Sequence, residues 1–276
     1  MSNDPGLLYV VATPIGNLED ITIRALRVLG EVDLIAAEHV PVARTLLRHF
    51  EIDTQVIPYH DRGHDAQRLV ERMHDGQSIA LVSDAGTPGV SDPGRNLIGA
   101  AVKAEIQIVP IPGPAASIAL WSVSGAASPG VYLHGFLPRK TGERRARLQQ
   151  VTERATGTII FESPRRILDT LRDIDEVMPE AHLVVGRELT KLHEQIWRGS
   201  PADAIDEFAQ PRGEFTILIT PPQEEPTLWS DAQIADALAE AAEQGASRSQ
   251  AARFVAQQSG RPRRDIYALW PFGQER

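Results

Sequence analysis

The 276-residue chain contains no cysteine. That absence excludes disulfide bonds, thiolate metal sites, iron–sulfur clusters and a cysteine nucleophile. The sequence also has no run of about 18 apolar residues, so it offers no membrane span. Its start has neither a basic n-region nor a cleavage-site pattern, so a secretory signal is not expected. Together these absences favour a cytoplasmic protein.

The chain also lacks an excess of basic residues. It has 28 Lys and Arg against 37 Asp and Glu, a net charge of −9, which argues against a protein coated in nucleic acid. Local basic patches still set the affinity for phosphate, and the charge is unevenly distributed. Segment 223–243 has six acids and no base, segment 246–264 has five arginines and no acid, and segment 139–154 has six bases against two acids. Taken singly, each such run is most simply a solvated helix face.

Short apolar runs alternate with helical patterns in the first part of the chain. Val/Ile/Leu-rich runs predict strands at 7–13, 33–38, 55–59, 78–84 and 106–112. Apolar residues at helical spacing predict helices at 21–32, 44–50, 66–74 and 96–104. Apolar strands separated by helices indicate a parallel sheet with both faces covered.

Dense proline and glycine around 110–114 indicates a domain boundary. Further strands are predicted at 131–136, 157–162, 182–189, 194–199 and 214–220, with helices at 143–153, 164–177 and 201–208. The last three strands are close in sequence, which favours antiparallel pairing among them. A linker at 221–227 precedes helices expected at 231–243, 247–258 and 263–270. We therefore expect two α/β domains, 1–112 and 113–222, and a small helical tail, 223–276.

Three loops rich in glycine and proline each follow a predicted strand. They are 13–18 after the first strand, 83–94 after the fourth and 112–116 after the fifth. Ligands of open parallel sheets bind at the carboxyl ends of the strands. Glycine lets the backbone approach a ligand and proline holds a loop rigid. One such loop is most simply an ordinary turn, but three at one sheet edge predict a shared cleft.

The loops do not have the form of a common nucleotide site. The sequence contains no G-x-x-x-x-G-K-[ST] motif and no G-x-G-x-x-G after a strand. A kinase, a P-loop ATPase and an ordinary dinucleotide dehydrogenase are therefore disfavoured. The cleft needs a ligand recognised mainly by backbone groups and a few carboxylates.

Several motifs occur together in one order along the chain. They are TPIGNLEDIT, LVSDAGTPGVSDPG, VPIPGPAA, GFLPRK, ESPRR, RELTKLHE and GEFTILI. This combination, from about residue 7 to 220, closely resembles the ribosomal RNA small subunit methyltransferase I family of the tetrapyrrole methylase (class III) superfamily. SDAGTP with DPG and RELTK are specific to that family, whereas PGP recurs across the superfamily.

The resemblance implies a cofactor, a partner and an activity. It implies S-adenosylmethionine in a cleft between two α/β domains, methylation of a cytidine 2′-oxygen in 16S ribosomal RNA of the small ribosomal subunit, a homodimer, and a helix-turn-helix-like tail. Carried over position by position, it assigns to cofactor binding Pro14, Gly16, Asn17, Ser83, Asp84, Ala85, Gly86, Thr87, Pro88, Gly113, Pro114, Ala115 and Ala116.

The sequence departs from the family pattern at two places. The family has Ala-Glu-Asp-Thr-Arg after the second strand, where this chain has Ala37-Glu38-His39-Val40-Pro41. Proline is favoured at the start of a helix, so Pro41 is expected to begin the next one. The family also has Phe-Tyr-Glu-Ser-Pro-His-Arg, where this chain reads FESPRR at 161–166, without the tyrosine and with the histidine replaced. The cofactor loops are intact, so these departures concern the RNA substrate or the rate.

Methyl transfer to a hydroxyl requires alignment and a proton acceptor. The sulfonium leaves as a neutral thioether, so most catalysis is expected from alignment in a dry cleft. A general base contributes roughly 10²–10⁴-fold. The candidates are Glu38, Glu162, Glu188 and Lys191, of which we carry Glu38, Glu188 and Lys191 as catalytic predictions. For each, a structural ion pair is an equally good interpretation.

RNA contact is assigned from charge and from the position of the family's basic loop. The expected RNA-binding residues are Arg139, Lys140, Arg144, Arg145, Arg147, Arg165 and Arg166. Arg248 to Arg264 in the tail form a second patch, which could instead dock on the acidic helix at 231–243.

Three alternatives stay open. One is a tetrapyrrole-type small-molecule methyltransferase, which would need a large apolar pocket, and another is a non-catalytic RNA-binding ribosome-assembly factor with a vestigial cofactor site. The third is a metal-dependent phosphohydrolase that uses His60 and His64. Gly63 and the flanking turn make that segment a solvated loop with no obvious third ligand, so no metal is expected.

Overall fold

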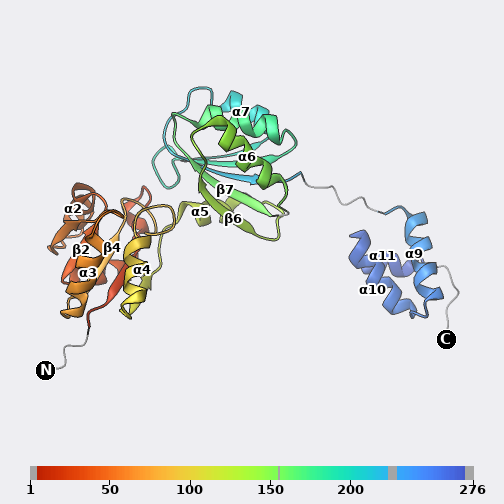
Figure 1. Ribbon diagram of the computed structural model, residues 1–276. Coiled ribbons are helices and arrows are strands. Elements are labelled where there is room, and N and C mark those ends of the chain that lie inside the picture. The colour runs from red at the N-terminus through yellow and green to blue at the C-terminus, as the bar shows by residue number, and fades with distance from the viewer. Residues whose placement is uncertain (1–4, 155, 223–228, 271–276) are drawn as a thin grey trace. The chain divides into compact units, whose positions relative to one another are not determined.

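A computed structural model of the protein describes residues 5–154, 156–222 and 229–270. The chain divides into two compact units, Met1–Pro222 and Gln223–Arg276. The first unit contains two β-sheets and the second consists of helices in its described part (Figure 1).

The first sheet is parallel, as the apolar runs predict. Within the described residues it has five strands: β1 (Leu8–Val11), β2 (Leu34–Ala37), β3 (Val56–Pro58), β4 (Ile79–Val82) and β5 (Ile108–Ile111). Their order is β3-β2-β4-β1-β5, and every pairing is parallel. β2 and β4 are buried along their whole length because helices cover both faces of the sheet.

Helices cover this sheet on both sides. α1 (Ile23–Glu31) and α2 (Val40–His49) pack on one face, and α3 (Asp65–His74) and α4 (Arg95–Lys103) on the other (Figure 1). α1 begins where the Thr22 hydroxyl accepts a hydrogen bond from the Ala25 amide (3.1 Å), an ordinary N-terminal cap. α2 has Pro41 in its first turn, in accord with the expectation that this proline opens the helix.

The second sheet is mixed. Its described strands are β6 (Val131–Phe136), β7 (Gly157–Glu162), β8 (His182–Arg187), β9 (Gln195–Gly199) and β10 (Phe215–Thr220), in the order β6-β7-β10-β8-β9. β6 and β7 are parallel, and β10 is antiparallel to both β7 and β8. β8 is also antiparallel to β9, so the predicted antiparallel pairing of the last three strands is confirmed.

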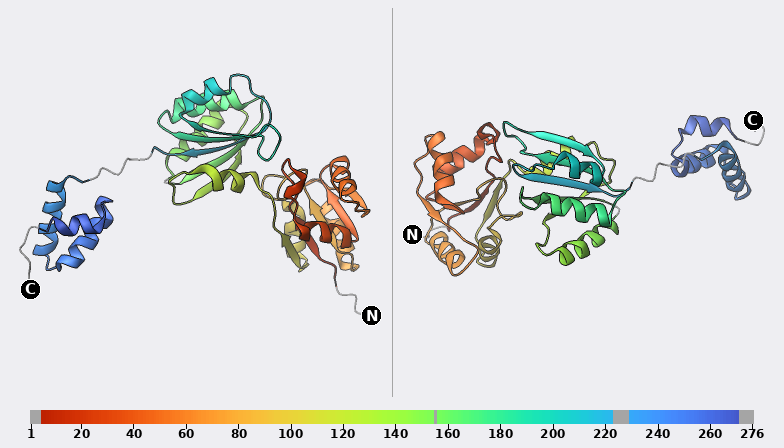
Figure 2. Two further views of the ribbon diagram at one scale, coloured as in Figure 1. Left: turned by 180° about the vertical axis from the view of Figure 1, so that it is seen from behind. Right: turned by 90° about the horizontal axis from the view of Figure 1, so that it is seen from above.

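Helices on the second sheet separate its two faces. α6 (Thr141–Thr152), α7 (Ile167–Val177) and α8 (Pro201–Glu207) cover one face, and both views of Figure 2 show helices of this segment on one side of the strands. α5 (Ala116–Ser124) packs through Leu120 on the other face. α5 is not expected from the sequence, because its apolar and small residues surround the whole helix and leave no helical periodicity.

The second unit has its own core. α9 (Asp231–Glu243), α10 (Arg248–Ser259) and α11 (Arg263–Ala268) pack together through Ile234, Leu238, Val255 and Ile266. α9 and α10 each begin with a serine capping box. Within the described ranges, no helix has the length and apolar character needed to cross a membrane.

Candidate functional site

The three glycine- and proline-rich loops lie together, as predicted. They follow β4, β1 and β5, which are neighbours in the sheet. Thr13 and Gly86 exchange two backbone hydrogen bonds of 2.9 and 3.0 Å, which join the first loop to the second. The Thr87 hydroxyl donates to the Pro114 carbonyl (3.3 Å), which joins the second loop to the third. The carboxyl edge of the first sheet is therefore one connected surface.

A cavity of about 350 Å³ opens against this surface. The loops contribute Thr87, Asp92 and Ala116 to its wall, and the second α/β segment contributes Phe161 and Leu189. Its volume is that of a pocket for one small molecule. The cavity is thus walled by both halves of the first unit.

Two glycines let the backbone form this wall. Gly86 has φ +78°, a conformation that L side chains rarely adopt, and it lines the cavity. A Cβ built on Gly113 would lie 3.0 Å from the Ala12 Cβ, so the third loop is packed tightly on β1. A cradle of backbone with carboxylates near it fits S-adenosylmethionine, whose sulfonium carries a positive charge.

The predicted cofactor residues fall into two groups. Those that line the cavity are Ala85, Gly86, Thr87, Ala115 and Ala116.

The other predicted residues do not line that cavity. Pro14, Ser83 and Asp84 line a separate hollow of about 270 Å³ beside α2. Asn17 caps a short 3-10 helix, η1 (Leu18–Asp20), by accepting from the Glu19 amide (3.1 Å). The remaining residues of this group shape the loops without lining the cavity: Gly16, Pro88, Gly113 and Pro114.

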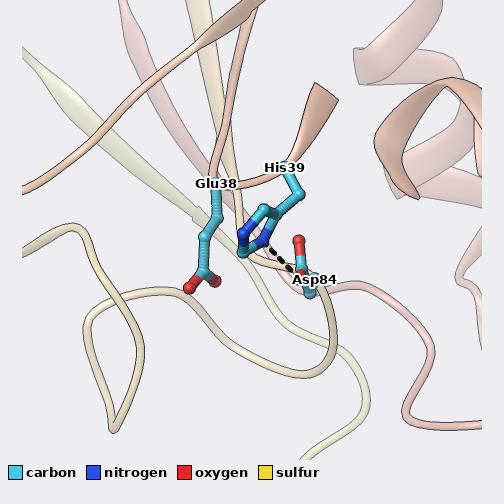
Figure 3. Close-up of side chains that lie close together, drawn as sticks. All are labelled: Glu38, His39 and Asp84. Carbon is cyan, nitrogen blue, oxygen red and sulfur yellow. Dashed lines mark hydrogen bonds and ion pairs between the residues drawn. The ribbon is translucent and has the colours of Figure 1, made fainter. Parts of the chain in front are cut away.

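Glu38, His39 and Asp84 form a cluster at the ends of β2 and β4 (Figure 3). His39 Nδ1 lies 2.7 Å from Asp84 Oδ2, and one ligand atom from each of the three side chains lies within 4.8 Å of the others. His39 and Asp84 are exposed, and their contact is a hydrogen bond between the side chains. We assign no metal to this cluster.

Glu188 and Lys191 are held in an ion-pair cluster. Lys191 Nζ lies 2.9 Å from Glu188 Oε1 and 2.8 Å from Glu214 Oε2. Burial alone would lower the pKa of Lys191, but Glu214 and Glu188 outweigh it and raise the pKa. Burial alone would raise the pKa of Glu188, but the hydrogen bonds from Lys191 and from the Glu214 amide lower it overall. Both side chains therefore hold their charges firmly and are poor proton acceptors.

This cluster also fixes a strained loop beside the cavity. Glu188 and Thr190 have φ of +52° and +68°, unusual values for residues with side chains. They flank Leu189, which lines the cavity. A Cβ built on Gly16 would lie 2.4 Å from Lys191 Cγ, so the first loop lies directly under the lysine stem. The lysine stem that these ion pairs hold therefore packs directly against the first loop.

Glu162 lines the cavity but is committed to structural hydrogen bonds. Its buried carboxylate accepts from the Ser163 amide (2.8 Å) and from the Thr170 hydroxyl (2.8 Å), and Arg166 lies 3.3 Å away. These contacts occupy both oxygens of the carboxylate. We therefore assign Glu162 to positioning the loop that follows β7.

Asp92 is a cavity residue that the sequence analysis did not select. It is partly buried, and no hydrogen bond or ion pair to its carboxylate occurs within the described residues. Burial raises its pKa to about 6, and the negative charges of Glu38, Asp84 and Glu214 add to the rise. The signal was present in the second loop, where Asp92 stands between two glycines and before Pro93.

The loop that carries Asp92 is anchored by the segment predicted to be a solvated turn. Asp61 accepts from the Gly94 amide (2.9 Å) and from the Tyr59 hydroxyl, and Tyr59 in turn accepts from the Leu97 amide (3.1 Å). Burial and Asp61 raise the pKa of Tyr59. This segment therefore holds α4 and its preceding loop, and in the described part of the chain His60 and His64 join no potential metal cluster.

Two aromatic rings stand at the cavity on the side of the second sheet. Phe136 of β6 and Phe161 of β7 both line it, with ring centroids 5.7 Å apart. Phe136 is 57% exposed, although it is a large apolar side chain. An exposed ring beside a cavity is a surface on which a planar group can stack.

The predicted RNA-binding residues divide by exposure. Arg144 is buried, and its Nε lies 2.6 Å from Asp173 Oδ2, so it serves the packing of α6 on α7 and not an RNA surface. Arg145 pairs with Asp173 and Glu176. Arg166 is partly buried and donates to the carbonyls of Leu137 (2.9 Å) and Pro138 (3.1 Å).

The remaining basic residues are exposed. Arg139 and Arg165 have exposed side chains and belong to the two loops that Arg166 ties together. Lys140 pairs with Glu143 (3.0 Å) and Arg147 bonds to Gln150 (2.7 Å), both on the surface of α6. Of the seven predicted RNA-binding residues, these four have exposed side chains.

Comparison with known proteins gives one consistent result. The tetrapyrrole (corrin/porphyrin) methylase family profile matches residues 7–205. The chain is 44% identical to the ribosomal RNA small subunit methyltransferase I of Synechocystis sp. over 271 residues, covering 96% of this chain and 97% of that protein. It is 38% identical to the protein of the same description from Halalkalibacterium halodurans, covering 97% and 96%.

Solved structures agree on the fold. The methyltransferase CobJ superposes with a TM-score of 0.59 at 19% identity, covering 78% of this chain and 94% of that chain. Uroporphyrin-III-C-methyltransferase from Thermus thermophilus gives a TM-score of 0.54 at 18% identity, covering 78% and 94%. These structures have the two-sheet α/β architecture of the first unit.

Proposed function

Because this chain belongs to the tetrapyrrole methylase family, and within it to the ribosomal RNA small subunit methyltransferase I proteins, we propose that it methylates small-subunit ribosomal RNA. The methyl donor is S-adenosylmethionine. The acceptor is the 2′-oxygen of a cytidine in 16S ribosomal RNA.

The observation that carries this proposal is the cavity at the joined loops. Backbone at Gly86 and the small side chains of Ala115 and Ala116 form one wall, so a ligand can approach the main chain closely. Asp92 and Glu214 bring negative charge to the same space. Backbone groups suit an amino acid and a nucleoside, and carboxylates suit a sulfonium cation. When bound, the donor supplies a methyl group that is strongly electrophilic because it is attached to that cation.

The mouth of the cavity suits an RNA acceptor. Phe136 and Phe161 offer faces on which an unstacked base can lie, as in other sites that recognise single-stranded RNA. Arg139 and Arg165 offer exposed charges for the flanking phosphates. The similarity to ribosomal RNA small subunit methyltransferase I proteins favours RNA over a tetrapyrrole as the acceptor.

A homodimer and a role for the tail belong to the same proposal. Ile118 and Val123 of α5 are 60% and 44% exposed, which leaves apolar surface available for a second copy of the chain. The helices of the second unit carry exposed Arg253 and Arg264, and their charge supports a contact with RNA.

The test uses labelled S-adenosylmethionine with small ribosomal subunits and, separately, with naked 16S RNA. Label retained at one nucleotide after nuclease digestion, with alkali resistance of the following phosphodiester bond, supports ribose 2′-O-methylation. Label on a base contradicts the 2′-oxygen assignment. Donor binding without transfer to any RNA contradicts the enzyme assignment and favours a vestigial site.

A variant pair tests the placement of the donor. Asp84→Ala combined with Gly113→Trp is expected to weaken donor binding by more than tenfold, because the indole cannot fit where a Cβ already lies 3.0 Å from Ala12. Asp53→Asn is the matched control, since this exposed residue precedes β3 at the opposite edge of the sheet. Full donor affinity in the Asp84/Gly113 variant would show that the donor lies elsewhere.

A further inference from the structure

Methylation of a hydroxyl releases a proton, and the site must accept it. The pKa of a ribose hydroxyl is far above neutral, so a carboxylate near the acceptor oxygen assists the step as a general base. Such a base must reach the cavity and have a free lone pair. The structure allows each carboxylate to be judged by these two requirements.

The carboxylates expected from the sequence do not meet both requirements. Glu188 is bonded to Lys191 and to the Glu214 amide. Glu162 is buried and accepts from two donors at 2.8 Å. Glu38 does not line the cavity; it lies with His39 and Asp84 at the ends of β2 and β4 (Figure 3).

Asp92 meets both requirements. Its side chain lines the cavity, and within the described ranges no donor is bonded to its carboxylate. Three acids act on Asp92: Glu38 after β2, Asp84 after β4 and Glu214 before β10. Besides Asp92, the charged residues of the cavity wall are Glu162, Glu214 and Lys191. Lys191 is already bonded to Glu188 and Glu214. The carboxylate of Asp92 therefore stands in a field of like charge without a partner of its own.

The backbone around Asp92 is held from both sheets. Asp61 binds the Gly94 amide (2.9 Å), and the Gly89 amide donates to the Pro93 carbonyl (3.3 Å). From the second sheet, Gly135 approaches so closely that a Cβ there would lie 3.2 Å from Ser91 Oγ. A base held on a clamped loop keeps its geometry while substrate binds.

We propose that Asp92 is the general base, an inference that rests on the proposed function. The acceptor oxygen forms a bond to the methyl carbon while the carbon–sulfur bond breaks, with its electron pair left on the neutral thioether. The proton of the hydroxyl passes to the Asp92 carboxylate and from there to water. The sulfonium loses its positive charge when it leaves as the thioether, and the positive charge of the hydroxyl proton is carried away by Asp92.

The ionisation of Asp92 suits this role. Burial and the neighbouring acids raise its pKa to about 6, so it is deprotonated at neutral pH and more basic than an ordinary aspartate. The positive charge of S-adenosylmethionine should stabilise the carboxylate and displace its proton. S-adenosylhomocysteine has no such charge and should not do so.

The first experiment measures proton release on binding, without turnover. Calorimetry of the full-length protein at pH 6 in buffers of different ionisation enthalpy should show S-adenosylmethionine releasing up to about half a proton, since a group is half protonated at its pKa. S-adenosylhomocysteine should release markedly less. In Asp92→Asn the difference between the two ligands should disappear, and S-adenosylmethionine should bind several-fold more weakly because the carboxylate that its charge stabilises is gone. Equal release in wild type and Asp92→Asn would overturn the assignment of the titrating group.

The second experiment measures methyl transfer to small-subunit RNA against pH under single-turnover conditions. Wild type should lose rate tenfold per pH unit on the acid side and level off above it, with a midpoint below the ligand-free pKa of about 6 because the bound donor stabilises the carboxylate. Asp92→Asn should lower the rate by roughly 10²–10⁴-fold and remove this acid limb, while Asp92→Glu restores part of the rate. Asp53→Asn should behave as wild type.

A third variant separates Asp92 from Glu38. Glu38→Gln removes one of the charges that raise the pKa of Asp92, so the acid limb should move to lower pH with the plateau rate retained. Loss of the plateau in Glu38→Gln together with a normal rate in Asp92→Asn would make Glu38 the base. If wild type labels no RNA at all, the proposed function fails; if wild type labels RNA and Asp92→Asn keeps its full rate, only the present inference fails.

Discussion

At the scale of single residues, Asp92 is a carboxylate kept in an unfavourable place. It lies partly buried among Glu38, Asp84 and Glu214 and receives no hydrogen bond within the described residues. An unpaired charge of this kind lowers stability, and functional sites commonly retain such groups.

The stability of the protein should therefore rise when this charge is removed. The folded pKa of about 6 lies above the ordinary value of 3.8, so Asp92 contributes stability that is present below pH 3.8 and lost as the pH rises through 6. After discounting for solvent screening, Asp92→Asn should raise the free energy of unfolding at pH 7.5 by on the order of 1 kcal/mol. Thermal unfolding of wild type and variant at pH 4 and pH 7.5 checks this: the difference in Tm should be positive at pH 7.5 and small at pH 4. A lower Tm for the variant at pH 7.5 would show that Asp92 has a stabilising partner.

At the scale of secondary-structure elements, α6 and α7 are joined by a buried ion pair. Asp173 of α7 is 2% exposed and lies 2.6 Å from Arg144 Nε and 2.7 Å from Arg145 Nε. These arginines were predicted to contact RNA because the sequence of the basic run 139–154 reveals its charge but does not reveal which of its side chains are buried. The pair instead fixes the helix that follows the loop of Arg139.

Breaking one side of this pair should be severe. Asp173→Leu leaves Arg144 buried without its carboxylate and should lower the free energy of unfolding by about 3–5 kcal/mol. The double variant Arg144→Met/Asp173→Leu removes both charges and should recover most of the loss, because apolar groups of similar size can replace a buried pair. Denaturant unfolding of both variants measures the difference. Equal losses would mean that the packing of α6, and not the unpaired charge, controls stability.

Much of the element order follows from the sequence. The buried strands could be predicted because they are short apolar runs between turn residues, and the joined loops because parallel strands end at one edge. α5 could not, because its apolar residues have no helical period. The second loop marked Asp92 as a residue near the cleft, but its position among Glu38 and Glu214, which are distant in sequence, could not be predicted. For Glu188 and Lys191, the sequence left a catalytic role and a structural ion pair as equal alternatives. The structure shows the ion pair.

At the scale of the whole molecule, a chain with net charge −9 must bind RNA through a few local cations. Arg139 and Arg165 are exposed arginines on the loops that follow β6 and β7, near Phe136 and Pro164 of the cavity wall in the sequence. Electrostatic binding to single-stranded RNA falls with salt in proportion to the number of phosphates contacted.

The double variant Arg139→Gln/Arg165→Gln should therefore weaken RNA binding most at low salt. The slope of log affinity against log salt should become less negative by about 1.4, at about 0.7 per contact. Filter binding of a 16S RNA fragment over a range of salt concentrations measures the slope. Donor affinity should not change, and an unchanged slope would place the RNA elsewhere on the protein.

The second unit should be dispensable for donor binding. All residues that line the cavity lie between Ile15 and Thr216, and the helices α9 to α11 have a separate core. A chain ending at residue 222 should fold, and calorimetry should give a donor Kd within about twofold of the full-length value. A large loss of affinity would reveal a dependence of the cavity on residues 223–276.

One irregularity in β6 determines which side chain stands at the cavity mouth. The pairing of β6 with β7 passes from Leu133 opposite Ile159 to Gly135 opposite Ile160, so His134 is an extra residue. Phe136 is thereby placed opposite Phe161, and both rings face the cavity. In a regular ladder of the same length, with His134 opposite Ile160, Phe136 would stand opposite Glu162 and point toward α7. One surplus amino acid in the strand therefore decides which side of the sheet its phenyl ring occupies, and deleting His134 should make the pairing regular while leaving Phe136 opposite Phe161.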